Sequence, residues 1–194
     1  MKIFFHSTIT QPQLNTNKQY YQFIESLGHQ HTTNFPIEYQ PHDMLDPKVR
    51  KTAKKLLKSQ ETAIRKADIV ILNANTPSIG TGVYLQIAMH LSKPVIALCE
   101  NKAQIPFLYE AFDYNKLMIV ECTPQNFKTA IPRNLKKAAK LVDKRFTLLL
   151  PPEVVEMLDN HYSKTGETRS DYIRNLIKVD QEKRTNTPSA KLLA

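Results

Sequence analysis

Short apolar runs alternate with helical segments over the first 142 residues, and this alternation constrains the fold more than any other feature of the sequence. The run at 69–72 is apolar without interruption, which is typical of a strand that helices cover on both faces. Strands of this kind, joined through helices, form parallel sheets. We therefore predict an α/β domain over residues 1–142, with an open parallel sheet in a Rossmann- or flavodoxin-like sandwich.

The elements of this domain follow from local signals. Apolar residues at spacings of three and four indicate helices, while β-rich runs bounded by turn residues indicate strands. The predicted elements are a strand at 2–7, a helix at 18–27, a short strand within 29–41, a helix at 46–66, a strand at 68–72, a helix at 82–91, strands at 94–98 and 117–120, and a helix within 124–142.

The last 52 residues follow a different pattern, with one strand and two helices. A strand-length run at 145–150 ends at two prolines, which can seat the first turn of a helix that Gly166 terminates. Thr168 then opens a capping box, with Asp in place of the usual Glu, at the start of a second helix. We expect this small module at 143–180 and a flexible tail at 181–194.

The charge of the chain is strongly basic. It carries 27 basic and 18 acidic residues, a formal net charge of +9 at pH 7. Much of the excess lies in the predicted helix at 46–66, where Glu61 is the one acid after the first residue. This helix presents either a solvated face or a surface that contacts phosphate, and the sequence leaves both open. Its basic residues are Lys48, Arg50, Lys51, Lys54, Lys55, Lys58, Arg65 and Lys66.

Composition excludes several classes of protein. Hydrophobic residues make up 41% and charged residues 23%, so most of the chain buries a core instead of staying disordered. The longest apolar stretches fall far short of the ~20 residues that span a bilayer, and we expect a cytoplasmic protein without membrane contact. Cys99 and Cys122 are expected to be buried free thiols, and the histidines lack metal-ligand spacing. We expect no cofactor and no metal ion.

The strand predicted at 145–150 needs a partner, since both of its edges would otherwise be unpaired. Antiparallel pairing with the same strand of a second copy predicts a homodimer built through residues 145–177. Such a two-stranded ribbon fits the DNA major groove, so Arg145, Thr147 and Leu149 would face the bases. The candidate phosphate contacts, at the start of the second helix, are Thr168, Arg169 and Ser170.

The run at 144–151, followed by 166–174, resembles the ribbon-helix-helix family of Arc, MetJ and CopG-like DNA binders. The resemblance covers most of residues 144–179 and rests on the strand alternation, the first helix, the glycine turn and the capped second helix in that order. It implies a dimeric module that binds double-stranded DNA. Leu149 stands where that family usually has a polar base reader, and a module that only dimerises the chain is the alternative.

A turn-rich loop at 73–82 follows the buried strand. In an open α/β sheet, ligands bind outside the carboxyl ends of the strands, so this loop is expected to border a pocket. Its glycines allow close approach of the backbone, and the start of the next helix offers amides for an anion. The candidate ligand-binding residues at this edge are His6, Ser7, Asn73, Ser78, Gly80, Thr81 and Gly82.

The runs at 67–72, 77–82 and 93–98, with the opening run at 2–7, resemble the nucleoside 2-deoxyribosyltransferase family and its deoxynucleotide N-hydrolase relatives. The resemblance extends over roughly residues 1–140, and it implies a nucleoside or nucleotide ligand. In that family a glutamate just after the second loop glycine attacks the anomeric carbon of deoxyribose, and an aspartate lies near the end of the preceding helix.

This chain departs from that pattern at both acids. Tyr84 stands at the glutamate position, and Gln60 stands at the aspartate position with Glu61 beside it. A phenol with a pKa near 10 is a poor replacement for a carboxylate nucleophile. The resemblance therefore implies loss of glycosyl transfer, and the catalytic candidates in an active chain would be Tyr84 and Glu61.

Together the two halves predict a dimeric DNA-binding protein of the transcription-regulator type, whose catalytically inactive α/β domain senses a nucleotide or nucleoside. The alternative is a nucleoside deoxyribosyltransferase or deoxynucleotide N-glycosidase tethered by a dimerisation module. A third hypothesis is purely structural, with the C-terminal module clamping two α/β domains together.

Overall fold

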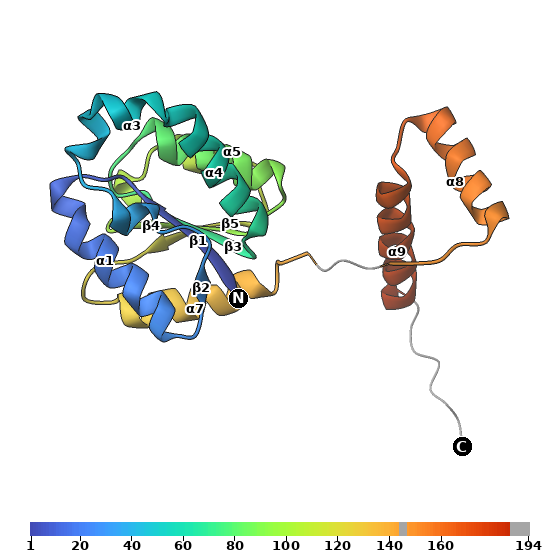
Figure 1. The fold of residues 1–194 in the computed structure, drawn as a ribbon. Coiled ribbons are helices and arrows are strands. Elements are labelled where there is room, and N and C mark those ends of the chain that lie inside the picture. The colour runs from blue at the N-terminus through green and yellow to red at the C-terminus, as the bar shows by residue number, and fades with distance from the viewer. Residues whose placement is uncertain (144–146, 187–194) are drawn as a thin grey trace, which may run out of the picture. The chain divides into compact units, whose positions relative to one another are not determined.

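The computed structural model describes residues 1–143 and 147–186. The chain divides into two compact units, Met1–Lys144 and Arg145–Ala194 (Figure 1). The first is an α/β unit and the second contains two helices, so the two units are described separately.

The α/β unit is built on a five-stranded sheet in the order β2-β1-β3-β4-β5, and all of its strand pairs are parallel. This order is that of flavodoxin-like folds, which confirms the predicted open parallel sheet. The strands are β1 (Lys2–Ser7), β2 (Gln30–His31), β3 (Ile69–Asn73), β4 (Val95–Cys99) and β5 (Leu117–Glu121).

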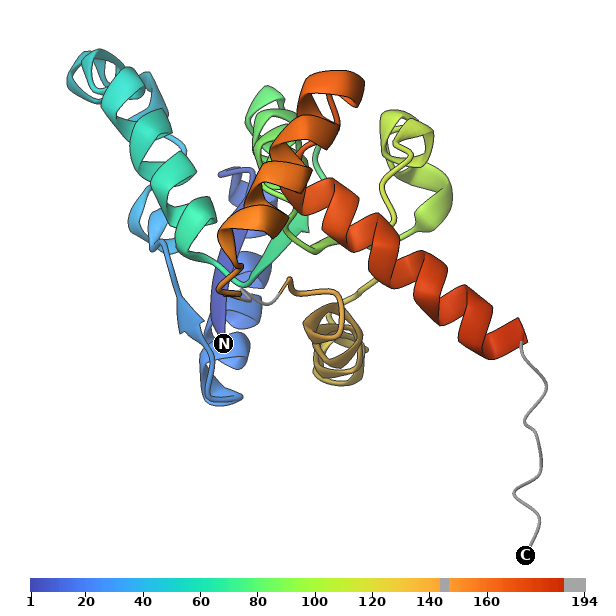
Figure 2. The same cartoon turned by 90° about the vertical axis from the view of Figure 1, so that its right-hand side faces the viewer.

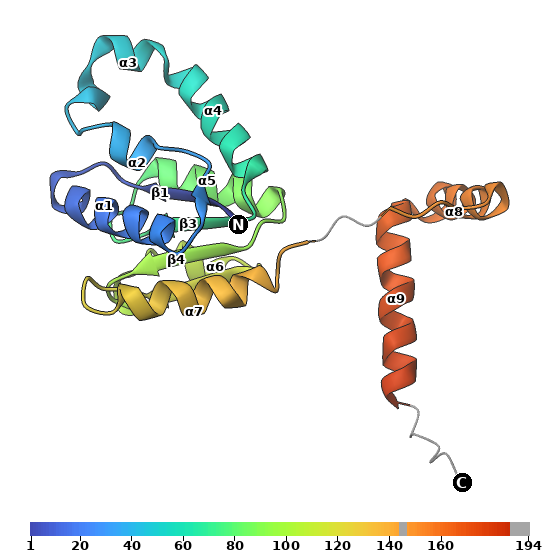
Figure 3. The same ribbon diagram turned by 60° about the horizontal axis from the view of Figure 1, so that its bottom comes forward.

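Helices cover both faces of the sheet, as Figures 1 and 3 show. Residues of α1 and α7 pack on one face, and residues of α4, α5 and α6 pack on the other. In Figure 2, α7 (gold) lies below the sheet, while α5 and α6 (green and yellow-green) lie above it. The helical elements are α1 (Gln11–Ser26), α2 (Phe35–Glu38), η1 (Asp43–Leu45), α3 (Pro47–Lys51), α4 (Ala53–Lys66), α5 (Ile79–His90), η2 (Lys102–Gln104), α6 (Leu108–Ala111) and α7 (Phe127–Ala139).

The central strands are buried on both faces, as the uninterrupted apolar run predicted. Successive side chains of a strand point to opposite faces, so Phe5 and Ile71 pack toward α1 and α7 while Phe4 and Leu72 pack toward α4 and α5. All four are fully buried. Both core clusters contain side chains from β1 and from β3. The two strands are paired in parallel up to their last residues, so their carboxyl ends lie next to each other.

The structure differs from the prediction in the basic segment. The expected single helix at 46–66 is two helices, because α3 ends at Lys51 and α4 begins at Ala53. Asp46 caps α3 by accepting a hydrogen bond from the backbone N–H of Lys48, at 2.7 Å. Helix α1 is longer than predicted, since it begins at Gln11 with a proline in its first turn, a position that suits proline.

The second unit consists of α8 (Pro152–Thr165) and α9 (Arg169–Asn186). Gly166 ends α8 in the left-handed conformation, with φ of 73°. The Thr168 hydroxyl accepts from the Asp171 N–H at 3.2 Å, which is one half of the predicted capping box, and it donates to the Asp171 carboxylate at 2.7 Å. Helix α9 continues through 181–186, where the sequence predicted the beginning of a flexible tail.

The strand predicted at 145–150 is not observed in the part that the structure describes. Arg145 and Phe146 lie outside the described residues, and residues 147–150 form no strand within the chain. The ribbon-helix-helix arrangement, which needs a second copy, therefore stays a prediction. None of the helices in the described ranges has the length and apolarity that crossing a bilayer requires.

Candidate functional site

The start of α5 lies just beyond the carboxyl end of β3, at the edge where the sequence predicted a ligand site. Ser78 caps this helix: its hydroxyl accepts a hydrogen bond from the Thr81 N–H at 3.1 Å and lies 2.8 Å from the Thr81 hydroxyl. Thr8 holds the preceding loop, since its hydroxyl donates to the Thr76 carbonyl at 3.0 Å. The helix start is thus fixed against β1 as well as β3.

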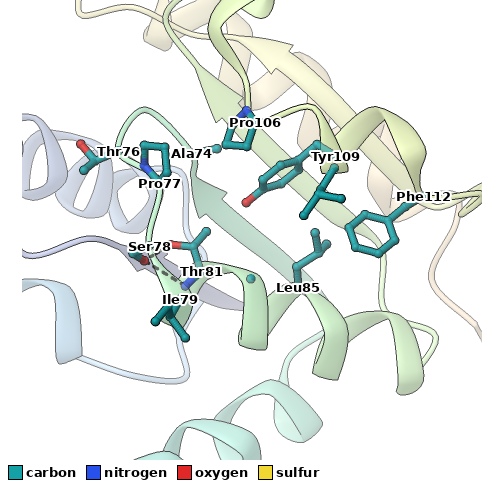
Figure 4. Close-up of a pocket in the computed structure, with 12 residues that line it drawn as sticks. Ala74, Thr76, Pro77, Ser78, Ile79, Thr81, Leu85, Pro106, Tyr109 and Phe112 are labelled. Carbon is teal, nitrogen blue, oxygen red and sulfur yellow. Dashed lines mark hydrogen bonds between the residues drawn. The ribbon is translucent and has the colours of Figure 1, made fainter.

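An apolar pocket of about 500 Å³ lies on one side of α5. Figure 4 shows Leu85, Tyr109 and Phe112 around the same space as Ser78 and Thr81. None of the described lining residues carries a carboxylate. The lining residues are Ala74, Thr76, Pro77, Ser78, Ile79, Thr81, Gly82, Leu85, Pro106, Leu108, Tyr109 and Phe112.

A second group of side chains gathers around Gly80, which we call the Gly80 recess. A methyl group at Gly80 would lie 3.8 Å from His6 Nε2, 3.8 Å from Ser78 Oγ and 3.9 Å from Tyr84 Cε2, all ordinary van der Waals distances. Residues two apart on a helix point about 200° apart, so Gly80 and Gly82 face opposite sides of α5. Ser78 borders both the recess and the apolar pocket.

His6 is the buried titratable group of the recess. Its side chain is stacked on Phe35, with ring centroids 5.8 Å apart, and meets Tyr84 edge-on at 4.5 Å. The residue is only 4% exposed, and its Nδ1 is buried without a hydrogen-bond partner among the described residues. Burial lowers the pKa of His6 to about 3, because desolvation disfavours the charged imidazolium. His6 is therefore neutral at physiological pH.

Tyr84, to which the sequence resemblance assigned the position of the family's nucleophile, lies on the same side of α5 as Gly80. Its ring packs edge-on against Phe4 at 5.7 Å as well as against His6, and the residue is 7% exposed. Burial raises the pKa of Tyr84, so its phenol stays protonated at neutral pH. The site therefore holds two neutral groups side by side, His6 and Tyr84.

The structure does not bring Glu61 to this site. The Glu61 carboxylate forms an ion pair with Arg65 at 2.9 Å, and both side chains are substantially exposed. Its neighbour Gln60 is buried, with its amide oxygen accepting a hydrogen bond from the Thr33 hydroxyl at 3.0 Å. A neutral amide thus fills the position at which the family has an aspartate.

Ser7 and Asn73 are buried at the ends of β1 and β3, where they are paired in register, and neither lines the pocket. The Asn73 amide donates to Asn17 Oδ1 at 3.1 Å and to Gln13 Oε1 at 3.3 Å. These bonds join the end of β3 to α1. Asn73 therefore anchors the end of β3, from which the loop to α5 starts.

The sequence analysis missed the second wall of the pocket. Pro106, Leu108, Tyr109 and Phe112 come from the segment around α6, directly after β4 and η2. A short run rich in aromatic and apolar residues just past the carboxyl end of a strand was the available signal. Helix α6 is only four residues long, which is too short for its periodicity to be detected.

Two of the residues predicted to contact DNA have partners within the described part of the second unit. Thr168 caps α9, and Arg169 forms an ion pair with Asp159 of α8. Thr147, Leu149 and Ser170 are exposed, and Arg145 lies outside the described residues. Within the described ranges, no three His, Cys, Asp or Glu side chains gather closely enough to hold a metal ion.

Comparisons with known proteins bear on the fold. Neither a protein-family model nor a curated protein sequence matches the chain. Among solved structures, a 2-deoxyribosyltransferase from Bacillus psychrosaccharolyticus matches 76% of this chain and 100% of its own, with a TM-score of 0.50 and 19% identity. A CMP N-glycosidase from Clostridium botulinum matches 71% of this chain and 98% of its own, with a TM-score of 0.47 and 16% identity. The α/β unit thus has a nucleoside 2-deoxyribosyltransferase-like fold, as the resemblance implied.

The prediction of a DNA-binding regulator as the main function is wrong. The solved structure whose fold the α/β unit shares is a 2-deoxyribosyltransferase, which backs the alternative drawn from the sequence better than its main prediction. In the described part of the second unit, three arginines, Arg169, Arg174 and Arg184, each pair with an aspartate. The sequence analysis expected Arg169 to contact phosphate, whereas its side chain pairs with Asp159 of α8.

The buried His6 predicts an acid-sensitive stability. Its pKa is about 3 when folded and 6.5 when exposed, so between these values the unfolded chain binds a proton that the folded chain does not. The free energy of unfolding therefore falls as pH drops from 6.5 toward 3. In urea unfolding between pH 4 and 6, His6→Phe should reduce this slope by up to about 1.4 kcal/mol per pH unit. The matched control, His90→Phe at an exposed position, should leave the slope unchanged; equal slopes in all three proteins would contradict the assignment.

Proposed function

We propose that this chain acts on the N-glycosidic bond of a nucleoside or nucleotide, as an N-glycosidase. One observation carries the proposal: an apolar pocket of about 500 Å³ opens at the start of α5, on a sheet of deoxyribosyltransferase-like fold. The volume lies within the range of small-molecule sites, and the position is the one at which open α/β sheets bind ligands.

The two sides of α5 suit the two parts of such a ligand. The walls formed by Leu85, Tyr109 and Phe112 suit a flat, weakly polar base. Ser78 and the first amides of α5 suit the sugar hydroxyls or a phosphate group. Because Ser78 borders both the pocket and the Gly80 recess, a ligand lying across the helix start would bring its glycosidic bond toward His6 and Tyr84.

The chemistry of the recess favours hydrolysis over transfer. A transferase of the related family holds the sugar on a carboxylate, and no described carboxylate lines the pocket. In the proposed reaction, water forms the new bond to the anomeric carbon as the bond to the base nitrogen breaks. The protonated Tyr84 phenol donates its proton to the departing nitrogen and regains one from the attacking water. Neutral His6 borders this path as a hydrogen-bonding group.

This proposal is tested by base release from a panel of nucleosides and their 5′-monophosphates, followed by liquid chromatography. Tyr84→Phe should lower the rate by about 100-fold or more, since it removes the proton donor. Glu61→Ala is the matched control and should keep the wild-type rate, because Glu61 is paired with Arg65 on the outer face of α4. Addition of a second free base should yield no exchanged nucleoside.

Three results would contradict the proposal. Absence of base release across the whole panel would exclude the activity. An unchanged rate in Tyr84→Phe would remove Tyr84 from the chemistry. Base exchange at a rate comparable to release would indicate a transferase, and so a nucleophile that the pocket does not contain.

We further propose that the second unit joins two copies of the chain through residues 145–177 in a ribbon-helix-helix-type dimer. Leu158 is the one fully apolar side chain that is buried in the described part of this unit. So small a core is insufficient for a unit of this size, and association would cover the rest. The exposed apolar side chains are Leu148, Leu149, Met157, Tyr162, Leu176, Ile177 and Val179.

Two neighbouring substitutions in the full chain test the dimer. In a paired strand, Leu148 faces the helices and Leu149 faces away. Leu148→Lys should give a monomer by light scattering, because it places a charge in the dimer core, whereas Leu149→Lys should remain a dimer. A monomeric wild-type protein, or two variants that behave alike, would contradict the proposed pairing.

A further inference from the structure

A shallow groove of about 400 Å³, separate from the α5 site, lies along α4. Three lysines and three hydroxyl side chains dominate it, and the one apolar lining residue is Ala63. The lining residues are Thr32, Lys55, Lys58, Ser59, Thr62, Ala63 and Lys66. Thr32 follows β2, while the other residues lie on one side of α4.

The lysines of this groove have no counterions in the described part of the chain. Lys55, Lys58 and Lys66 form no ion pair there, and the single acid of α4, Glu61, is held by Arg65 at 2.9 Å. Lys55 and Lys58 are three residues apart, which places like charges side by side on the helix and destabilises it. An anion bound in the groove would relieve this repulsion.

The groove geometry favours a compact anion with several charges. Three ammonium groups balance a multiply charged phosphate chain better than a single carboxylate, and the free Ser59 hydroxyl can donate to phosphate oxygens. The volume is that of a small-molecule site. We propose that this groove binds the phosphate chain of a small oligophosphate, such as a pyrophosphate or triphosphate group, independently of the site at α5.

Calorimetric titration of the full chain with inorganic tripolyphosphate, at low salt, tests this inference. The wild-type protein should bind it, and affinity should fall steeply as salt rises. The double variant Lys58→Glu/Lys66→Glu should bind at least about 30-fold more weakly. The matched control is Lys136→Glu/Lys137→Glu, which makes the same change in net charge on exposed positions of α7, in the layer on the other side of the sheet (Figure 3). This control should lose less than about threefold.

The following outcomes would contradict the proposed oligophosphate site. Absence of tripolyphosphate binding, or equal losses in the two double variants, would overturn it, since the second result reports net charge alone. Tighter binding of a single-stranded oligonucleotide than of tripolyphosphate would overturn the assignment to a small anion. Thermal melting should confirm that both double variants are folded. Base release is assayed on the same proteins, so that loss of tripolyphosphate binding is distinguished from loss of the proposed N-glycosidase activity.

Discussion

The parallel pairing of β1 with β3 is the constraint on which the candidate site depends. It places Ser7 opposite Asn73, so that both strands end at the same edge of the sheet. His6 therefore lies beside the start of α5, although more than seventy residues separate them in sequence. The Thr8 bond to the loop and the Ser78 cap then fix the helix start against that edge.

Burial gives the site its chemical character. The same desolvation that lowers the pKa of His6 raises that of Tyr84, so both groups are neutral where they meet. The family that the sequence resembles has a carboxylate nucleophile at the position that the resemblance assigns to Tyr84. A neutral pair cannot hold a sugar covalently as a carboxylate does, but it can donate and accept protons. The proposed hydrolysis, in which Tyr84 transfers the proton, rests on this difference.

The central strands could be predicted from the sequence, because a strand that is buried on both faces has an uninterrupted run of apolar residues. The wall of the pocket around α6 could not be predicted, because a four-residue helix is too short to show a helical period. Tyr109 reaches the pocket only through tertiary packing. The break between α3 and α4 at Thr52 was also missed, because the helical spacing of apolar residues continues through it. For the second unit, the pattern gave the helices and the cap correctly. It did not predict that Arg169 is paired, since the ion pair with Asp159 links two helices and has no sequence signature.

The central claim is that one nucleoside-type ligand lies across the start of α5 and enters the Gly80 recess. Calorimetric binding of a nucleoside 5′-monophosphate to Gly80→Ala tests it most directly, because the added methyl fits against His6, Ser78 and Tyr84 without a clash and fills the recess. We expect the variant to melt at or above the wild-type temperature while binding the ligand at least about tenfold more weakly. Wild-type affinity in a folded Gly80→Ala protein would contradict the claim.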